Sequence, residues 1–146
     1  MRNSTESPEH MFANDAEIES IVCEFELCET PPARFNHRAH LTVAASYLLR
    51  LPFAEAHQRL RTNLLRFLKA HGVEEGYNET VTLFWLKRIN KRIQNMEQNR
   101  GAYEIVNGIL EDGGDSRIVY DYYTKEQLVS REARSGWVEP DLKRLD

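Results

Sequence analysis

Two short segments of this chain place polar side chains that could take part in chemistry at the start of a predicted apolar helix. The first is residues 35–41, Phe-Asn-His-Arg-Ala-His-Leu, and the second is residues 77–85, Tyr-Asn-Glu-Thr-Val-Thr-Leu-Phe-Trp. Imidazole and carboxylate groups can move protons or hold ligands. If the two helix starts meet, they form a polar pocket on an apolar floor, and we expect the functional site there.

The histidines of the first segment, His37 and His40, are neighbours on one helix face because they are three residues apart. Unpaired backbone N–H groups and the positive end of the helix dipole disfavour protonation at such a position, so we expect neutral rings. A neutral imidazole can accept a proton or bind a metal. The structural alternative is that one ring hydrogen-bonds near the helix start while the other packs against Phe35.

A metal site built on this histidine pair lacks a third ligand in the sequence. Catalytic zinc needs three protein ligands, and neither H-E-x-x-H nor C-x-x-C is present. Cys23 and Cys28 are five residues apart, which predicts two reduced thiols in a cytoplasmic protein. We therefore assign no metal ligand and name no cofactor, while a metal-dependent enzyme using His37 and His40 stays an alternative.

The carboxylate of Glu79 is the candidate acid or base of the second segment. It lies in the first turn of a predicted helix beside an apolar face, where the pKa of a carboxylic acid can be raised. Asn78 shares a helix face with Trp85 and could present its amide over the indole ring. Helix capping is the structural alternative for the polar residues of this segment.

The predicted site combines both segments with a tyrosine from the second helix. The candidate catalytic residues are His40 and Glu79, and the candidate ligand-binding residues are His37, Tyr47, Tyr77, Asn78 and Trp85. We expect their pocket to lie between the second and fourth helices and to bind a small organic molecule, with general acid–base catalysis as an option. The rival prediction is a non-catalytic interaction or regulatory module that uses exposed apolar surface near the end of the chain.

Helical spacing of apolar residues accounts for most of the chain, and no stretch alternates with period two. Helices are predicted at about residues 14–29, 36–51, 52–70, 79–100 and 102–110, with short ones after residue 115. This pattern predicts an all-α, compact, single-domain bundle of five or six helices that spans residues 14–146. Residues 1–13 are expected to form a disordered tail, and an extended C-terminal arm is expected to be anchored by Trp137.

Composition narrows the classes of function. A chain of 146 residues with 41% hydrophobic and 29% charged residues is typical of one globular domain. Its net charge of −4 argues against a nucleic-acid partner, although Lys87, Arg88, Lys91 and Arg92 form a basic cluster. Without a signal peptide or an apolar run long enough to span a bilayer, we expect a cytoplasmic protein with no membrane partner. The oligomeric state does not follow from the sequence.

Three motifs resemble those of a family of small uncharacterised bacterial helical proteins. They are Phe-x-His-x-x-His-Leu-x-x-Ala at residues 35–44, Tyr-x-Glu-Thr-x-Thr-x-x-Trp at 77–85 and Trp-Val-Glu-Pro-Asp-Leu at 137–142. The resemblance implies an all-α fold but no reaction, because the family has no established activity. Relatives often carry histidine at the position of Asn78, which would add a third imidazole to His37 and His40. Asparagine is a poor transition-metal ligand and no base, so this chain departs from the pattern there.

Overall fold

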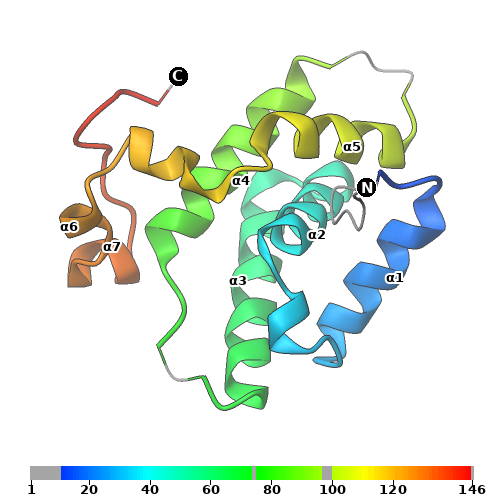
Figure 1. The fold of residues 1–146 in the computed structure, drawn as a ribbon, viewed down its shortest axis with the longest axis horizontal. Helices are drawn as coiled ribbons and strands as arrows, with labels where there is room; N and C mark the ends of the chain where they lie inside the picture. The colour runs from blue at the N-terminus through cyan, green and yellow to red at the C-terminus, as the bar shows by residue number, and fades with distance from the viewer. Residues whose placement is uncertain (1–10, 74, 97–99, 146) are drawn as a thin grey trace, which may run out of the picture.

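The computed structural model describes residues 11–73, 75–96 and 100–145. Five longer helices carry most of the structure (Figure 1): α1 (Asp15–Glu26), α2 (His37–Arg50), α3 (Phe53–Ala70), α4 (Glu79–Gln94) and α5 (Ala102–Gly113). Four short helices complete it: the 3-10 helices η1 (Pro32–Arg34) and η2 (Ser116–Asp121), and the α-helices α6 (Lys125–Leu128) and α7 (Arg131–Ser135).

This architecture confirms the predicted all-α bundle. The described residues contain no β-strand, and the two short helices after residue 124 raise the number of α-helices slightly above the expected five or six. In the part of the chain that the structure describes, no helix combines the length and the apolar character that crossing a bilayer requires.

Asparagine caps set the starts of three helices, α1, α2 and α4, of which α2 and α4 carry the predicted site. Asn14, Asn36 and Asn78 each accept a hydrogen bond from the backbone N–H three residues on, at 3.0–3.1 Å. Such caps satisfy N–H groups that have no partner inside the helix. The α3 helix begins after Pro52 and is followed by Gly72, whose φ of 72° lies in the left-handed region that favours glycine.

The α2 helix lies at the centre of the bundle and packs against α1, α3, α4 and α5 (Figure 1). Its buried face includes Leu41, Ala44 and Ala45. The small alanine side chains let the neighbouring helices approach closely, which strengthens van der Waals contact across the centre. As a result the first turns of α2 lie against the N-terminal half of α4, where the second polar segment begins.

The C-terminal arm is extended after α7, as predicted, and runs back along α4. The Thr80 hydroxyl donates to the carbonyl of Gly136 at 2.6 Å and accepts from the N–H of Val138 at 3.2 Å. Trp137 packs edge-on against the ring of Tyr123, with 6.3 Å between ring centroids. The anchoring of the arm therefore comes from backbone contacts with buried Thr80 as well as from the predicted indole.

Phe12 extends the packed domain two residues before the predicted boundary. Its backbone N–H and C=O pair with the side-chain amide of Asn107 on α5 at 2.9 and 3.0 Å. The guanidinium of Arg38 lies 4.6 Å from the centre of its ring. The sequence analysis assigned Phe12 to a tail, because a single aromatic in a polar segment carries no periodic signal. Residues 1–10 of the predicted tail lie outside the described residues.

Candidate functional site

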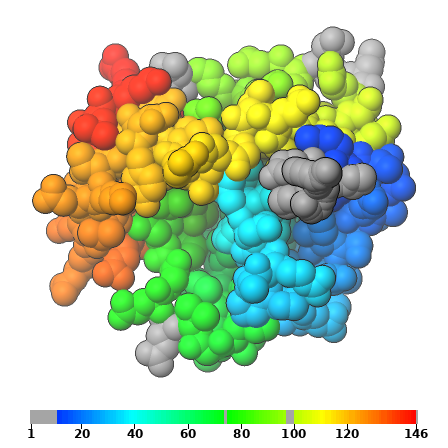
Figure 2. Space-filling view, viewed as in Figure 1, coloured from blue at the N-terminus to red at the C-terminus, as the bar shows by residue number. Residues whose placement is uncertain are grey.

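A pocket of about 530 Å³ lies between the starts of α2 and α4 and the segment from η2 to α6. In Figure 2 the surface is hollowed between the cyan start of α2 and the orange segment that holds α6. We call it the histidine pocket. Its polar lining residues are Asn36, His37, His40, Asn78, Thr82 and Ser116. The rest of the lining is mostly apolar. The volume of the pocket and the composition of its lining suit a small organic ligand.

His37 is held by the protein itself. Its Nε2–H donates to the backbone carbonyl of Gly113 at 2.8 Å, which places the proton of the neutral ring on Nε2. The ring packs edge-on against the indole of Trp85, with 4.6 Å between centroids. Burial lowers the pKa of His37, although the Gly113 carbonyl and the Asp115 carboxylate oppose that shift. The N–H donor of the neutral His37 ring is therefore engaged by the protein, whereas no described group donates a hydrogen bond to its Nδ1.

His40 lines the same pocket. Its ring packs against Phe35, with 4.2 Å between centroids and 43° between planes. Burial, with a smaller contribution from His37, lowers the pKa of His40 to about 4. Among the described residues, no group hydrogen-bonds to either of its ring nitrogens. At neutral pH the pocket thus contains an uncharged imidazole whose donor and acceptor have no partner in the described part of the chain.

Asn78 and Trp85 both line the pocket, but in different ways. The Asn78 Oδ1 caps the N–H of Val81 at 3.0 Å, and its Nδ2 donates to the carbonyl of Leu128 at 2.7 Å. Both sides of the amide are therefore engaged in joining α4 to α6. Trp85 is 9% exposed and forms apolar floor beside the ring of His37.

Glu79 points away from the pocket and toward α3. Its carboxylate accepts hydrogen bonds from the Tyr77 hydroxyl and from Nε2 of His57, the latter at 2.9 Å, and Nε of Arg61 lies 3.5 Å away. The reason is helical geometry, since one residue turns the side chain by about 100° relative to Asn78. Neither Glu79 nor Tyr77 lines the histidine pocket, so the structure separates the two candidate catalytic residues, His40 and Glu79.

His57 received no role in the sequence analysis, yet it is a direct partner of Glu79. The signal that could have indicated it is the spacing of His57 and Arg61, which are four residues apart and share a face of α3. Two basic side chains on one face predict an acidic partner on a neighbouring helix. Burial, and then the hydrogen bond to Glu79, raise the pKa of the Tyr77 hydroxyl, which keeps it a proton donor in this cluster.

Tyr47 also lies away from the histidine pocket. It is fully buried, its hydroxyl donates to Oε2 of Glu26 at 2.6 Å, and it accepts from Nδ2 of Asn63 at 2.9 Å. Seven residues along α2 correspond to about 10 Å of rise from His40, which carries Tyr47 to the part of the bundle formed with α1 and α3. The prediction took Tyr47 into the site as a residue of the second helix and did not account for that distance.

No protein-family model, curated protein or solved structure matched this chain. The three motifs therefore remain a resemblance, and the membership that they indicate stays a prediction. A function has to be argued from the chemistry of the site, because an all-α fold supports many unrelated activities.

Among the residues that the structure describes, the histidine pair gains no third metal ligand. Within residues 11–73, 75–96 and 100–145, no group of three or more His, Cys, Asp or Glu side chains is placed to hold a metal ion. In addition, the Nε2–H of His37 is directed at the carbonyl of Gly113. The alternative of a metal-dependent enzyme would need a ligand from elsewhere, since a catalytic zinc needs three from the protein.

We expect Glu79→Gln to lower the free energy of unfolding by about 1–2 kcal/mol. The change keeps the size of the side chain but removes the negative charge that lies beside His57 and Arg61. Urea denaturation at neutral pH measures the difference. Glu75→Gln is the matched control, because exposed Glu75 pairs with Arg134 only at the surface, at 3.4 Å, and should lose less than about 0.5 kcal/mol. Equal losses in the two variants would contradict the structural role of Glu79.

Proposed function

We propose that this protein binds a small, uncharged organic molecule in the histidine pocket, with His40 as its main hydrogen-bonding partner. The observation that carries the proposal is the neutral ring of His40 at the pocket wall, to which no described residue forms a hydrogen bond. The side chain of His40 is half-buried, so its ring nitrogens remain accessible from the pocket. A polar group that lines a pocket without a partner in the protein is typical of a position where a ligand supplies the partner.

The chemistry of the lining supports an uncharged ligand. No Asp, Glu, Lys or Arg is among the described residues that line the histidine pocket. A charged ligand would lose its water there without gaining an ion pair, which is strongly unfavourable. Apolar side chains such as Leu41, Leu60 and Val119 offer instead a surface for a hydrophobic body.

Binding is supported better than acid–base catalysis by the residues of this pocket. A general base works best when its pKa lies near the operating pH. His40, with a pKa of about 4, is a weak base at neutral pH, although it still accepts or donates a hydrogen bond. Glu79, the other candidate base, faces His57 on α3 and does not reach a ligand in the pocket.

Fragment screening by NMR tests the proposal through the ring resonances of the histidines. We expect uncharged fragments to shift the signals of His40, and His40→Leu to weaken their binding at least about tenfold, the worth of one good hydrogen bond. His71→Leu is the matched control, since His71 donates to the carbonyl of Cys28 at 3.1 Å and does not line the pocket. Fragments that bind equally well to His40→Leu, or a library in which none moves the His40 signals, would contradict the proposal.

Exposed apolar side chains do not favour the rival prediction of an interaction module. The large ones, such as Leu27, Leu65 and Leu142, come from separate elements, and scattered exposed residues of this kind are normal on monomeric proteins. Tyr120 and Val129 are exposed as well, but they line the histidine pocket. They therefore add apolar surface to the same ligand site.

A further inference from the structure

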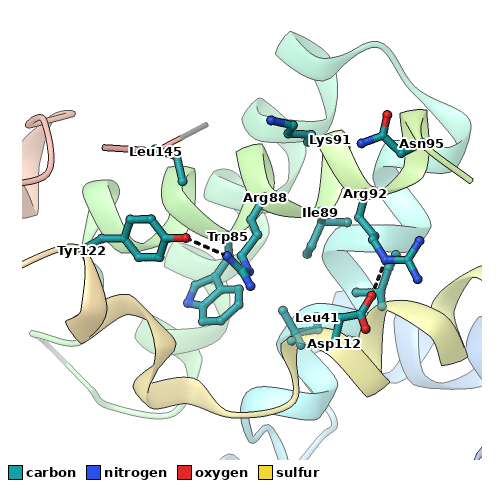
Figure 3. A pocket seen from close by; sticks show the side chains of 12 residues that line it. Leu41, Trp85, Arg88, Ile89, Lys91, Arg92, Asn95, Asp112, Tyr122 and Leu145 are labelled. Carbon is teal, nitrogen blue, oxygen red and sulfur yellow. Dashed lines mark hydrogen bonds and ion pairs between the residues drawn. The ribbon is translucent and has the colours of Figure 1, made fainter. Parts of the chain in front are cut away.

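A second pocket, of about 490 Å³, lies between α4 and α5 (Figure 3). It shares Leu41 and Trp85 with the histidine pocket, and its other lining residues are different. Ile89 and Ile109 extend its apolar floor. Its distinguishing feature is the presence of cationic side chains from α4, and we call it the arginine pocket.

Helical spacing explains why aromatic and cationic groups face the same space. Trp85, Arg88, Ile89 and Arg92 lie at offsets of zero, three, four and seven, which places them on one face of α4. Figure 3 shows both guanidinium groups on the side of α4 that is directed toward the pocket. The floor is therefore apolar while the wall along α4 is positively charged.

The two arginines differ in their partners. Arg92 forms an ion pair with Asp112 on α5. Arg88 is half-buried, and its Nη1 donates to the Tyr122 hydroxyl at 3.3 Å (Figure 3). In the part of the chain that the structure describes, no carboxylate forms an ion pair with Arg88 or Lys91. A guanidinium has five N–H donors, so the single long bond to Tyr122 leaves most of the donors of Arg88 for another acceptor.

We propose that the arginine pocket binds a small organic acid, with its carboxylate on Arg88 and its apolar body against Trp85. Guanidinium and carboxylate groups match as two parallel hydrogen bonds, which is the favoured geometry for this pair. Lys91, which also lines the pocket, adds positive charge. Asp112 is paired with Arg92, so Arg88 is the guanidinium left for a ligand. One guanidinium presents two parallel N–H groups, which match the two oxygens of a single planar carboxylate.

The four residues of the basic cluster on α4 do not all face the same space. Lys87 belongs to the cluster in sequence, but its ammonium lies 4.7 Å from the ring centre of Trp137 on the C-terminal arm and does not line the pocket. Arg88 and Arg92 line a cavity beside an indole. Such a divided arrangement is not the continuous basic surface that a phosphate backbone requires.

NMR titration of the full chain with 4-phenylbutyrate tests the proposal, read from the indole N–H signals of Trp85 and Trp137. The Trp137→Phe variant assigns the two signals. We expect a saturable shift of the Trp85 signal with a Kd of about 1 mM or tighter. The matched amide and amine, 4-phenylbutyramide and 4-phenylbutylamine, should bind at least about tenfold more weakly, because neither can form the paired ionic hydrogen bonds.

Variants locate the acid within the pocket. We expect Arg88→Gln to weaken binding of the acid at least about tenfold. Arg88→Lys keeps the positive charge but not the two parallel N–H groups of the guanidinium, so it should weaken binding less. Lys87→Gln removes the same charge from the same helix outside the pocket, and it should leave the Kd within about twofold. His40→Leu should also leave the Kd of the acid unchanged, because His40 does not line the arginine pocket. This proposal and the proposed function can therefore fail independently of each other.

Several outcomes would overturn the proposal. One is the absence of a saturable shift with the acid, and another is equally tight binding of the amide, which would indicate a purely apolar site. Losses of equal size in Arg88→Gln and Lys87→Gln would indicate long-range charge alone. Tighter binding of phenyl phosphate than of 4-phenylbutyrate would contradict the preference for a carboxylate. Loss of acid binding in His40→Leu would indicate that the acid binds in the histidine pocket instead.

Discussion

Replacement of Trp85 by alanine is expected to lower the free energy of unfolding by about 3–5 kcal/mol. The indole is 9% exposed and packs against the ring of Phe84, with 5.1 Å between centroids, as well as against His37. The backbone of α5 also comes close, since a Cβ added to Gly113 would lie 3.5 Å from Cζ3 of Trp85. These neighbours belong to three helices and cannot all move into the space that alanine leaves, so a cavity term adds to the lost burial.

The same substitution should join the two pockets, because Trp85 lines both. Denaturation experiments give the loss of stability, and a crystal structure of the variant shows whether the two spaces are continuous. Trp137→Ala is the matched control, as Trp137 is the other tryptophan of the chain and lies half-buried on the extended arm. Trp137→Ala should lower the free energy of unfolding clearly less than Trp85→Ala does. A Trp85 variant that is no less stable than the Trp137 variant would contradict the position assigned to the indole.

Acidification from pH 7 to pH 4 is expected to reduce the free energy of unfolding by up to about 3 kcal/mol through His40. Burial lowers the pKa of the folded-state ring to about 4, below its ordinary value of 6.5. Between these two values the unfolded chain binds a proton that the folded chain does not. The contribution of His40 is therefore complete above pH 6.5 and is lost as the pH falls toward 4. His37, whose pKa is also lowered by burial, acts in the same direction.

Urea denaturation at a series of pH values measures this loss. His40→Leu should flatten the profile between pH 6.5 and pH 4 relative to the unmodified protein, and the carboxylates common to both chains cancel in the comparison. An NMR titration of the His40 ring gives an independent readout, since its signals should stay constant down to about pH 5. Parallel stability profiles of the two proteins would contradict the buried, neutral state of His40.

Local chemistry of the sequence was enough to predict the helices and several of their starts. Asn36 and Asn78 precede apolar periodic segments, and both cap the helices that follow them. The neutral state expected for His37 and His40 agrees with the lowered pKa of both rings, although burial rather than the helix dipole is the main cause. Such features depend on residues within a few positions of one another, so short-range physics determines them.

The contents of the site were decided by the tertiary structure. Glu79 and Asn78 are adjacent in sequence, but one contacts α3 and the other lines the histidine pocket, because each helix presents different faces to different neighbours. Arg88 lines the arginine pocket because α5 lies beside its face of α4, whereas Lys87 faces Trp137 on the C-terminal arm. The sequence by itself determined that the chain is all-α, where its polar helix starts lie and which residues share a helix face. Only the packing of helices distant in sequence decided which of those faces meet, because periodicity specifies the orientation of a side chain within its own helix and not the helix that lies opposite.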